Sequence, residues 1–152
     1  MPAPIPDRPP PASPAMAAAG VDTAGNAAVL PDGVHHALIR RVDLAGDRVT
    51  VDVVQVFHDD AAVKAATADG KAPADARNLT TWVRNQNPRL RILPLAADLR
   101  VDFIEPCDEE PDRRAVPRRL AANARLGLYF YRLTVRDGSV HALVERQITP
   151  AC

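Results

Sequence analysis

The sequence predicts a mainly β protein with minor α: a single curled antiparallel sheet or small barrel of about seven strands with two short helices. Apolar and polar side chains alternate over short segments, which is typical of strands with one buried face. Turn residues separate those segments, above all Ala-Gly-Asp at 45–47 and Asp-Gly at 137–138. The chain has 152 residues, enough for one domain with a real core.

The first part of the chain differs in composition from the rest. Seven of the fifteen prolines lie within the first fourteen residues, and proline withholds a backbone donor. We therefore expect residues 1–30 to form a disordered Pro/Ala-rich leader or linker and residues 31–152 to form a single β-rich domain. No basic and apolar signal segment is present. Either the protein is cytoplasmic, or the start as written omits a signal.

A regular pattern begins after Leu30. Strands are expected at about 34–42 and 48–57, joined by the Ala-Gly-Asp turn into a hairpin. A helix should follow, with Asp59 or Asp60 as its N-cap and Gly70 as its left-handed C-terminal residue. These signals predict a hairpin followed by a short, alanine-rich helix.

The second half repeats the strand pattern. Further strands are expected at 79–85, 89–95 and 98–106, and a short helix within 111–125. A final hairpin should join 128–135 to 140–149 through Asp137-Gly138, because Asp-Gly suits a two-residue turn with positive φ.

Composition excludes several classes of function. The 19 basic and 19 acidic residues cancel, so no bulk field would attract a polyanion. No apolar run approaches the roughly 18 residues of a transmembrane helix. Aromatic residues make up 4% of the chain, and Trp82 alone accompanies the central arginines, so nucleic-acid binding is disfavoured.

Catalytic and cofactor motifs are missing from the sequence. Ser13 and Ser139 are the only serines, and neither lies in a G-x-S-x-G motif. The seven glycines are dispersed, so no nucleotide-binding loop is expected. Cys107 and Cys152 lack zinc-ligand spacing; they could form one disulfide in an exported protein or remain free thiols. We therefore expect no cofactor and name no catalytic residue; whether the chain is an enzyme is left open, with a non-enzymatic role favoured.

The histidines offer a weak metal case. His35 and His36 are adjacent on one strand and point to opposite faces. His58 precedes two aspartates, and His141 shares a strand face with Glu145. A cluster from different strands is allowed, but no ligand-spacing motif appears, so surface histidines bonded to neighbours are favoured and no metal site is predicted.

One segment, WVRNQNPRLRIL, is the candidate binding site. Residues 77–100 hold five arginines against one aspartate, whereas 43–75 hold seven acids against three bases. Guanidinium groups bind carboxylate or phosphate in bidentate fashion, so the arginines could hold an anion or a partner protein. Alternatively, the arginines form ion pairs with the acidic region 43–75 of the same chain. The two asparagines also suit a turn, so their role could be structural. The predicted ligand- or partner-binding residues are Trp82, Arg84, Asn85, Asn87, Arg89 and Arg91.

The runs GVHHALIRRVD, WVRNQNPRLRILPL and YRLTVRDGSVHALVERQITP together resemble a family of uncharacterised bacterial proteins, mainly from actinobacteria and also from firmicutes. Its members share an RN-NPR-R-LP segment and a C-terminal V-DG-V hairpin. The chain departs from that pattern in Thr81-Trp82, where an aromatic pair is usual, and in Glu145–Gln147, where Glu-Gln is usual. Many members look like secreted proteins or lipoproteins.

This resemblance implies a cell-envelope or secreted location, with the cytoplasm as the alternative. It implies no activity. The function expected is therefore a non-catalytic binding or structural module whose partner is a protein or a small anionic ligand. The alternatives are a receptor or enzyme built on the Arg84/Arg89/Arg91 segment and, third, a nucleic-acid-binding barrel.

Overall fold

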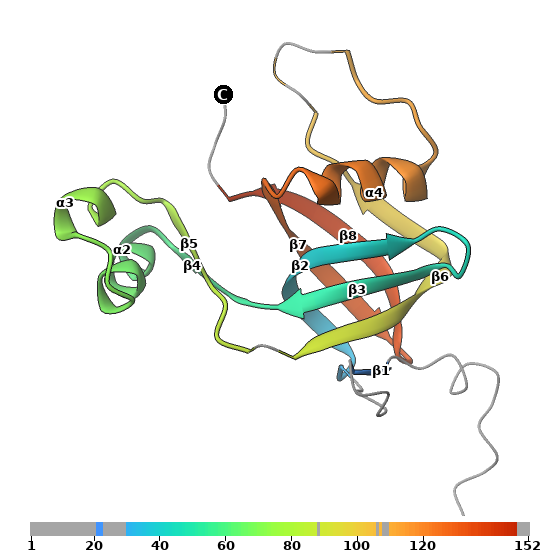
Figure 1. Cartoon of the computed structure of the whole chain (residues 1–152), viewed down its shortest axis with the longest axis horizontal. Coiled ribbons are helices and arrows are strands. Elements are labelled where there is room, and N and C mark those ends of the chain that lie inside the picture. Colours follow the sequence, from blue (N-terminus) through green and yellow to red (C-terminus); the bar gives the residue numbers. More distant parts are fainter. Residues whose placement is uncertain (1–20, 23–29, 88, 106, 108–109, 149–152) are drawn as a thin grey trace, which may run out of the picture.

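The computed structural model describes residues 21–22, 30–87, 89–105, 107 and 110–148 (Figure 1). The strands are β1 (Val21–Asp22), β2 (Gly33–Asp43), β3 (Arg48–Val53), β4 (Gln55–His58), β5 (Thr81–Arg84), β6 (Leu90–Asp102), β7 (Tyr129–Arg136) and β8 (Ser139–Gln147). The helices are α2 (Asp59–Ala68), α3 (Pro73–Ala76) and α4 (Val116–Arg125).

Five strands form a closed barrel in the order β6-β3-β2-β7-β8. Neighbours pair antiparallel except β6 and β8, whose parallel pairing closes the barrel. Alternate side chains of each strand point inward, as the two-residue period requires. The fully buried Val49, Val51, Leu93, Leu133 and Leu143 belong to this core.

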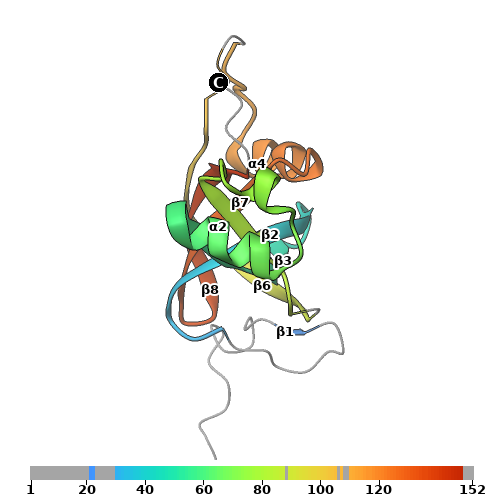
Figure 2. The same cartoon turned by 90° about the vertical axis from the view of Figure 1, so that its left-hand side faces the viewer.

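The other two strands stand apart from the barrel. β4 and β5 form a separate antiparallel sheet, and α2 and α3 connect them. Figure 1 shows this unit projecting sideways from the barrel, and Figure 2 views its helices from the front. We call the segment 55–84 the insertion, because it interrupts the chain between barrel strands β3 and β6.

Helix α4 lies across one end of the barrel and packs against β2 (Figure 1). Pro117 occupies its first turn, where a missing N–H costs nothing. Leu120 is completely buried and belongs to the barrel core. Asn123 donates hydrogen bonds to Glu145 on β8. One apolar contact and one polar contact thus hold the helix on the barrel.

The expected single sheet of about seven strands is only partly matched. The predicted strand 48–57 divides into β3 and β4. Val54 N–H still bonds to the His36 carbonyl opposite it at 2.9 Å, and from Gln55 onward the chain pairs with β5 instead of β2. The predicted strands 89–95 and 98–106 are one long strand, β6. Its first half pairs with β3 and its second half with β8. A third helix, α3, was not predicted.

Most of the expected leader lies outside the described residues. Within it, Val21 pairs with Ile92 and Asp22 with Arg91, so β1 adds a short strand to β6. Leu30, at the expected domain boundary, is 2% exposed and lies in the core cluster. These described residues before position 31 are therefore part of the folded unit. The boundary at residues 30 and 31 otherwise stays a prediction.

Local turn chemistry follows the expectation in two places and differs in one. Asp137 and Gly138 have φ of 51° and 76°, which is the positive pair of a two-residue hairpin turn. Gly70 after α2 has φ of 95°, as its predicted role requires. The N-cap of α2 is His58, however, not Asp59 or Asp60, and no side chain caps it.

Replacing Gly138 by valine should destabilise the final hairpin. A β-branched residue at φ of 76° carries steric strain of roughly 1–3 kcal/mol. Urea denaturation should show a lower midpoint with an unchanged slope. Gly138→Asn is the control, because Asn tolerates this conformation, and it should lose much less. Equal stability of the valine variant and the parent would contradict the turn geometry.

Candidate anion-binding site

Two of the predicted site residues, Trp82 and Arg84, converge on one carboxylate. Their side chains donate to Asp69 Oδ2 at 2.8 Å from the indole Nε1 and 3.0 Å from Arg84 Nε. The Arg84 guanidinium also lies over the Phe57 ring, 4.8 Å from its centre. The hydrogen bonds from Arg84 and Trp82 lower the pKa of Asp69. Arg84 is therefore ion-paired within the insertion, with an aspartate of the acidic region 43–75.

The two predicted asparagines have separate partners. Asn85 donates to Asp52 Oδ2 at 2.7 Å, and Arg40 pairs with the same oxygen at 2.8 Å. Because Asp52 is on β3 and nearly fully buried, this contact ties the end of β5 to the barrel. Asn87 Oδ1 accepts the N–H of Arg89 at 3.1 Å, which is the local turn bond expected of Asn.

The remaining arginines of the segment lie elsewhere. Arg89 is exposed just before β6, and Arg91 lies within β6 opposite Val51 of β3. The three arginines are therefore distributed between the insertion and the barrel, although the alternation expected them to project together. The proposal that this segment forms one shared anion site stays a prediction.

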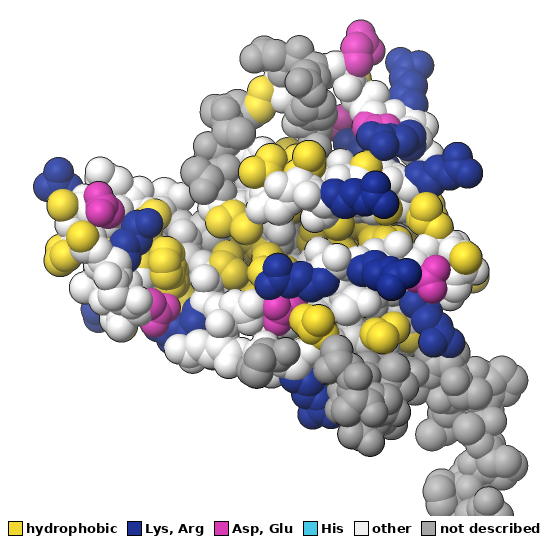
Figure 3. Space-filling view, in the orientation of Figure 1, with side chains coloured by type: hydrophobic (Ala, Val, Ile, Leu, Met, Phe, Trp, Pro, Cys, Tyr) yellow, Lys and Arg dark blue, Asp and Glu magenta, His cyan; other side chains and the backbone are white. Residues whose placement is uncertain are grey.

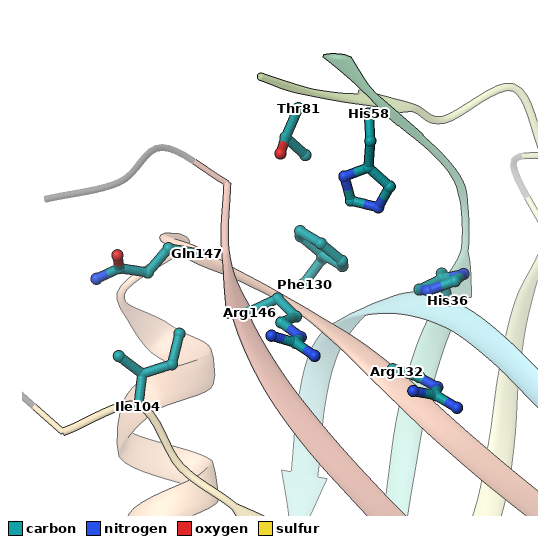
Figure 4. Close-up of a pocket in the computed structure, with 8 residues that line it drawn as sticks. All are labelled: His36, His58, Thr81, Ile104, Phe130, Arg132, Arg146 and Gln147. Carbon is teal, nitrogen blue, oxygen red and sulfur yellow. The ribbon is translucent and has the colours of Figure 1, made fainter. Parts of the chain in front are cut away.

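A different cluster of basic side chains lines a cavity beside the insertion. This cavity, of about 590 Å³, opens between the outer face of the barrel and the insertion (Figure 4). We call it the groove. Barrel strands β2, β7 and β8 contribute one wall and β4 and β5 the other. Its lining residues are His36, His58, Thr81, Ile104, Phe130, Arg132, Arg146 and Gln147.

Strand register explains why these side chains meet. His36 on β2 lies opposite Arg132 on β7. Phe130, two residues before Arg132 on the same strand, therefore points to the same face, and Arg146 on β8 lies opposite it. On the insertion, His58 lies opposite Thr81 and faces the barrel across the groove. Figure 4 shows the Phe130 ring lying among these side chains.

The groove is electropositive. Arg132 and Arg146 are exposed, and neither forms an ion pair or side-chain hydrogen bond with the described part of the chain. None of the described lining residues is acidic. Burial, followed by the charges of Arg132, His58, Arg146 and His35, lowers the pKa of His36. An anion bound in the groove would offset the repulsion between these positive charges.

The chemistry available in the groove is that of anion binding. Two guanidinium groups can each give a carboxylate or phosphate two parallel hydrogen bonds. Phe130 is 3% exposed and forms an apolar floor, beside which His36 lies with ring centres 6.1 Å apart. Low polarity at this floor strengthens charge interactions with a bound anion. Neither serine nor cysteine lines the groove among the residues described.

The described residues hold no group of three or more His, Cys, Asp or Glu side chains suited to a metal ion. His141 lies 3.1 Å from Asp98 Oδ1 and 3.1 Å from an Arg136 nitrogen. It is thus bonded at the surface to its neighbours, while Glu145 is buried and bonded elsewhere.

The sequence interpretation overlooked Phe130, Arg132 and Arg146. The available signal was the alternation of Phe130 and Arg132 along a strand, which places an aromatic and a cation on one face. His36 and His58 were considered only as metal ligands. No local pattern connected His36 and His58 with the other three residues, because the five come from four different strands.

Basic residues outside the groove do not gather into one comparable patch on the face that Figure 3 shows. Lysine and arginine side chains are spread there over the insertion and the barrel, with acidic ones between them. Scattered, mixed charges of this kind are typical of an ordinary solvated surface.

Two further findings bear on the setting of the protein. Cys107 is disulfide-bonded, which selects one of the two alternatives considered for it, while Cys152 lies outside the described residues. Among the helices in the described ranges, none combines the length and apolar character that a membrane crossing requires.

Comparison of the chain with protein-family models, curated proteins and solved structures gave no match, so the functional argument rests on the geometry of the groove.

Proposed function

We propose that this chain is a non-catalytic binding module that holds an anionic group in the groove. The observation that carries this proposal is the pair Arg132 and Arg146, which line a cavity of about 590 Å³ without an acidic neighbour in its described lining. Both side chains project from one face of the paired strands β7 and β8, where their like charges repel each other. A bound carboxylate or phosphate reverses that effect.

The barrel suits this role. Arg132 and Arg146 project from paired strands of a closed sheet, whose hydrogen bonds limit their backbone motion. Binding groups held on rigid strands lose less conformational freedom when a ligand arrives. Small β barrels carry ligand sites of many kinds, so the architecture permits the proposal without specifying the ligand.

The proposed location is the cell envelope or the secreted space. The family resemblance of the arginine segment and the C-terminal hairpin supports this location. The disulfide at Cys107 agrees with it, because disulfides persist mainly in oxidising compartments. Replacing Cys107 with serine in the host organism and comparing protein levels in each compartment would test whether export depends on this bond.

Replacing both Arg132 and Arg146 by glutamine should weaken anion binding at least about tenfold, since each lost charge-assisted contact contributes roughly 1.5–3 kcal/mol. Isothermal titration with sulfate and with succinate measures the affinity. Sulfate keeps its charge between pH 5 and 7, so its affinity should rise as pH falls and His36 gains a proton. The lowered pKa of His36 places that rise below its ordinary value of 6.5.

Two control variants make this test specific. Arg100→Gln removes an exposed arginine of β6 outside the groove and should leave sulfate binding unchanged. Arg89→Gln combined with Arg91→Gln tests the arginine segment predicted from sequence. If that variant alone abolished binding, the anion site would belong to the segment and the groove assignment would be wrong. Undiminished binding by the Arg132/Arg146 variant would lead to the same conclusion.

A further inference from the structure

Strand β5 has one open edge. It pairs with β4 alone among the described strands. Asp59 N–H donates to the Thr80 carbonyl at 3.0 Å. This bond shows which residues of β5 direct their backbone N–H and C=O groups toward β4. Because backbone groups alternate between the two edges, Thr80 and Trp82 face β4, whereas Thr81 and Val83 face the other edge. No described strand pairs with the backbone of Thr81 and Val83 there.

Two cavities follow this open edge. A second cavity, of about 320 Å³, is lined by residues 78–83 together with Lys71 and Ile148. Thr81 lines both this cavity and the groove. Gln147 lines the groove and the next residue, Ile148, lines the second cavity. The two cavities therefore adjoin along the edge of β5, near the end of β8, and we call the pair the channel.

The channel is basic along its length. Arg132 and Arg146 line one part, and Lys71 lines the other, with its ammonium group 5.5 Å from the centre of the Trp82 ring. None of the described residues that line either cavity is Asp or Glu. The charge complement of this channel is an acidic ligand, and its polar edge also offers main-chain donors and acceptors.

We propose that the channel binds an extended, acidic peptide segment of a partner protein, which adds as a third strand to the open edge of β5. The peptide backbone pairs with Thr81 and Val83, and an Asp or Glu side chain reaches Arg132 and Arg146. This inference rests on the proposed anion-binding function and names its ligand class. Strand addition is a general mode of peptide recognition, in which backbone bonds supply affinity and side-chain pockets supply specificity.

Two physical arguments favour a peptide over a small free anion. A two-stranded sheet is marginally stable by itself, so a third strand would stabilise the insertion. A small anion fills part of the groove and leaves the backbone groups of Thr81 and Val83 without a protein partner. An extended peptide of about five residues, roughly 17 Å long, can satisfy both the edge and the arginines.

The test uses a capped hexapeptide of alternating Glu and Thr as probe, with calorimetry on the whole chain. It should bind, and the matching Gln/Thr peptide should bind at least tenfold more weakly. Two further peptides carry N-methyl groups on alternate residues, in the two opposite phases. One phase should abolish binding and the other should not, because only one set of peptide N–H groups can face β5. Amide exchange at Thr81 and Val83 should slow when the unmodified peptide binds.

The outcomes separate this inference from the proposed function. If sulfate binds and the Glu/Thr peptide does not, the groove holds an anion and the peptide inference is wrong. If neither binds, both proposals fail. Equal binding of the two N-methylated peptides would exclude strand addition. Binding of oligothymidylate in preference to the peptide would assign the channel to a nucleic-acid strand and overturn the inference.

Discussion

Replacing Glu145 by leucine is expected to lower the free energy of unfolding by about 3 kcal/mol or more, because one buried and two half-buried donors lose their acceptor. Glu145 is 2% exposed. It accepts Tyr131 OH at 2.8 Å and the Asn123 amide at 3.1 and 3.2 Å from its two oxygens. It also accepts the N–H of Ile104 at 3.2 Å. These donors come from β7, α4 and the segment after β6, so one carboxylate joins three parts of the fold.

The surroundings of Tyr131 favour its protonated hydroxyl, which donates to Glu145. Burial, followed by the charge of Glu145 and the hydrogen bond to it, raises the pKa of Tyr131 well above its ordinary value. Leucine matches much of the volume of Glu145 but accepts nothing, and each orphaned donor then costs roughly 1–3 kcal/mol.

Urea denaturation monitored by Trp82 fluorescence and far-UV circular dichroism measures the loss. Glu145→Gln keeps the shape and one acceptor, so its loss should be clearly smaller than that of the leucine variant. Tyr131→Phe removes one donor together with its bond and should also cost less. A leucine variant as stable as the parent would show that the carboxylate is not needed to hold these segments.

The second large effect is expected at the helix that covers the barrel end. Truncating Leu120 to alanine should cost about 2–5 kcal/mol, since it removes three carbons from a fully buried position and leaves a cavity. Leu120 is 0% exposed and lies in the main core cluster. Arg119, the other buried residue of α4, already contacts the Phe103 ring, 4.2 Å from its centre, so it cannot refill the space without losing that contact.

Leu126→Ala provides the matched control for this prediction. Leu126 ends the same helix and is 58% exposed, so its truncation should change stability by less than about 0.5 kcal/mol. Both variants are compared by thermal unfolding. Similar melting temperatures for the two would mean that α4 is not anchored through Leu120. A loss confined to Leu120→Ala would establish that anchor.

The parts of the fold that were predicted correctly depend on local sequence. The strand 34–42 and the final hairpin follow from two-residue alternation and from the positive φ that Asp137-Gly138 accepts. The helix after His58 and its end near Gly70 follow from alanine content and a residue that tolerates left-handed backbone. Each of these signals lies within about ten residues of the structure it determines.

The errors occurred where local signals do not select a partner. The sequence predicted separate strands at 89–95 and 98–106, yet β6 runs from Leu90 to Asp102, with Pro94 opposite Arg48 and the Leu95 N–H bonded to the Asp47 carbonyl. The sequence around Arg84 is equally compatible with a shared arginine patch and with an internal ion pair. Only the position of α2 brings Asp69 within 3.0 Å of it.

The sequence by itself determined which residues share a strand face, where the hairpins turn and which catalytic motifs are missing. The tertiary structure alone decided that β6 and β8 pair in parallel and close the barrel. It also decided that His36, Arg132 and Arg146 meet the insertion residue His58 around one groove. The reason is physical. Alternation follows from the covalent geometry of one strand, whereas pairing depends on packing between segments far apart in sequence, such as Leu95 with Val140 and His36 with Arg132.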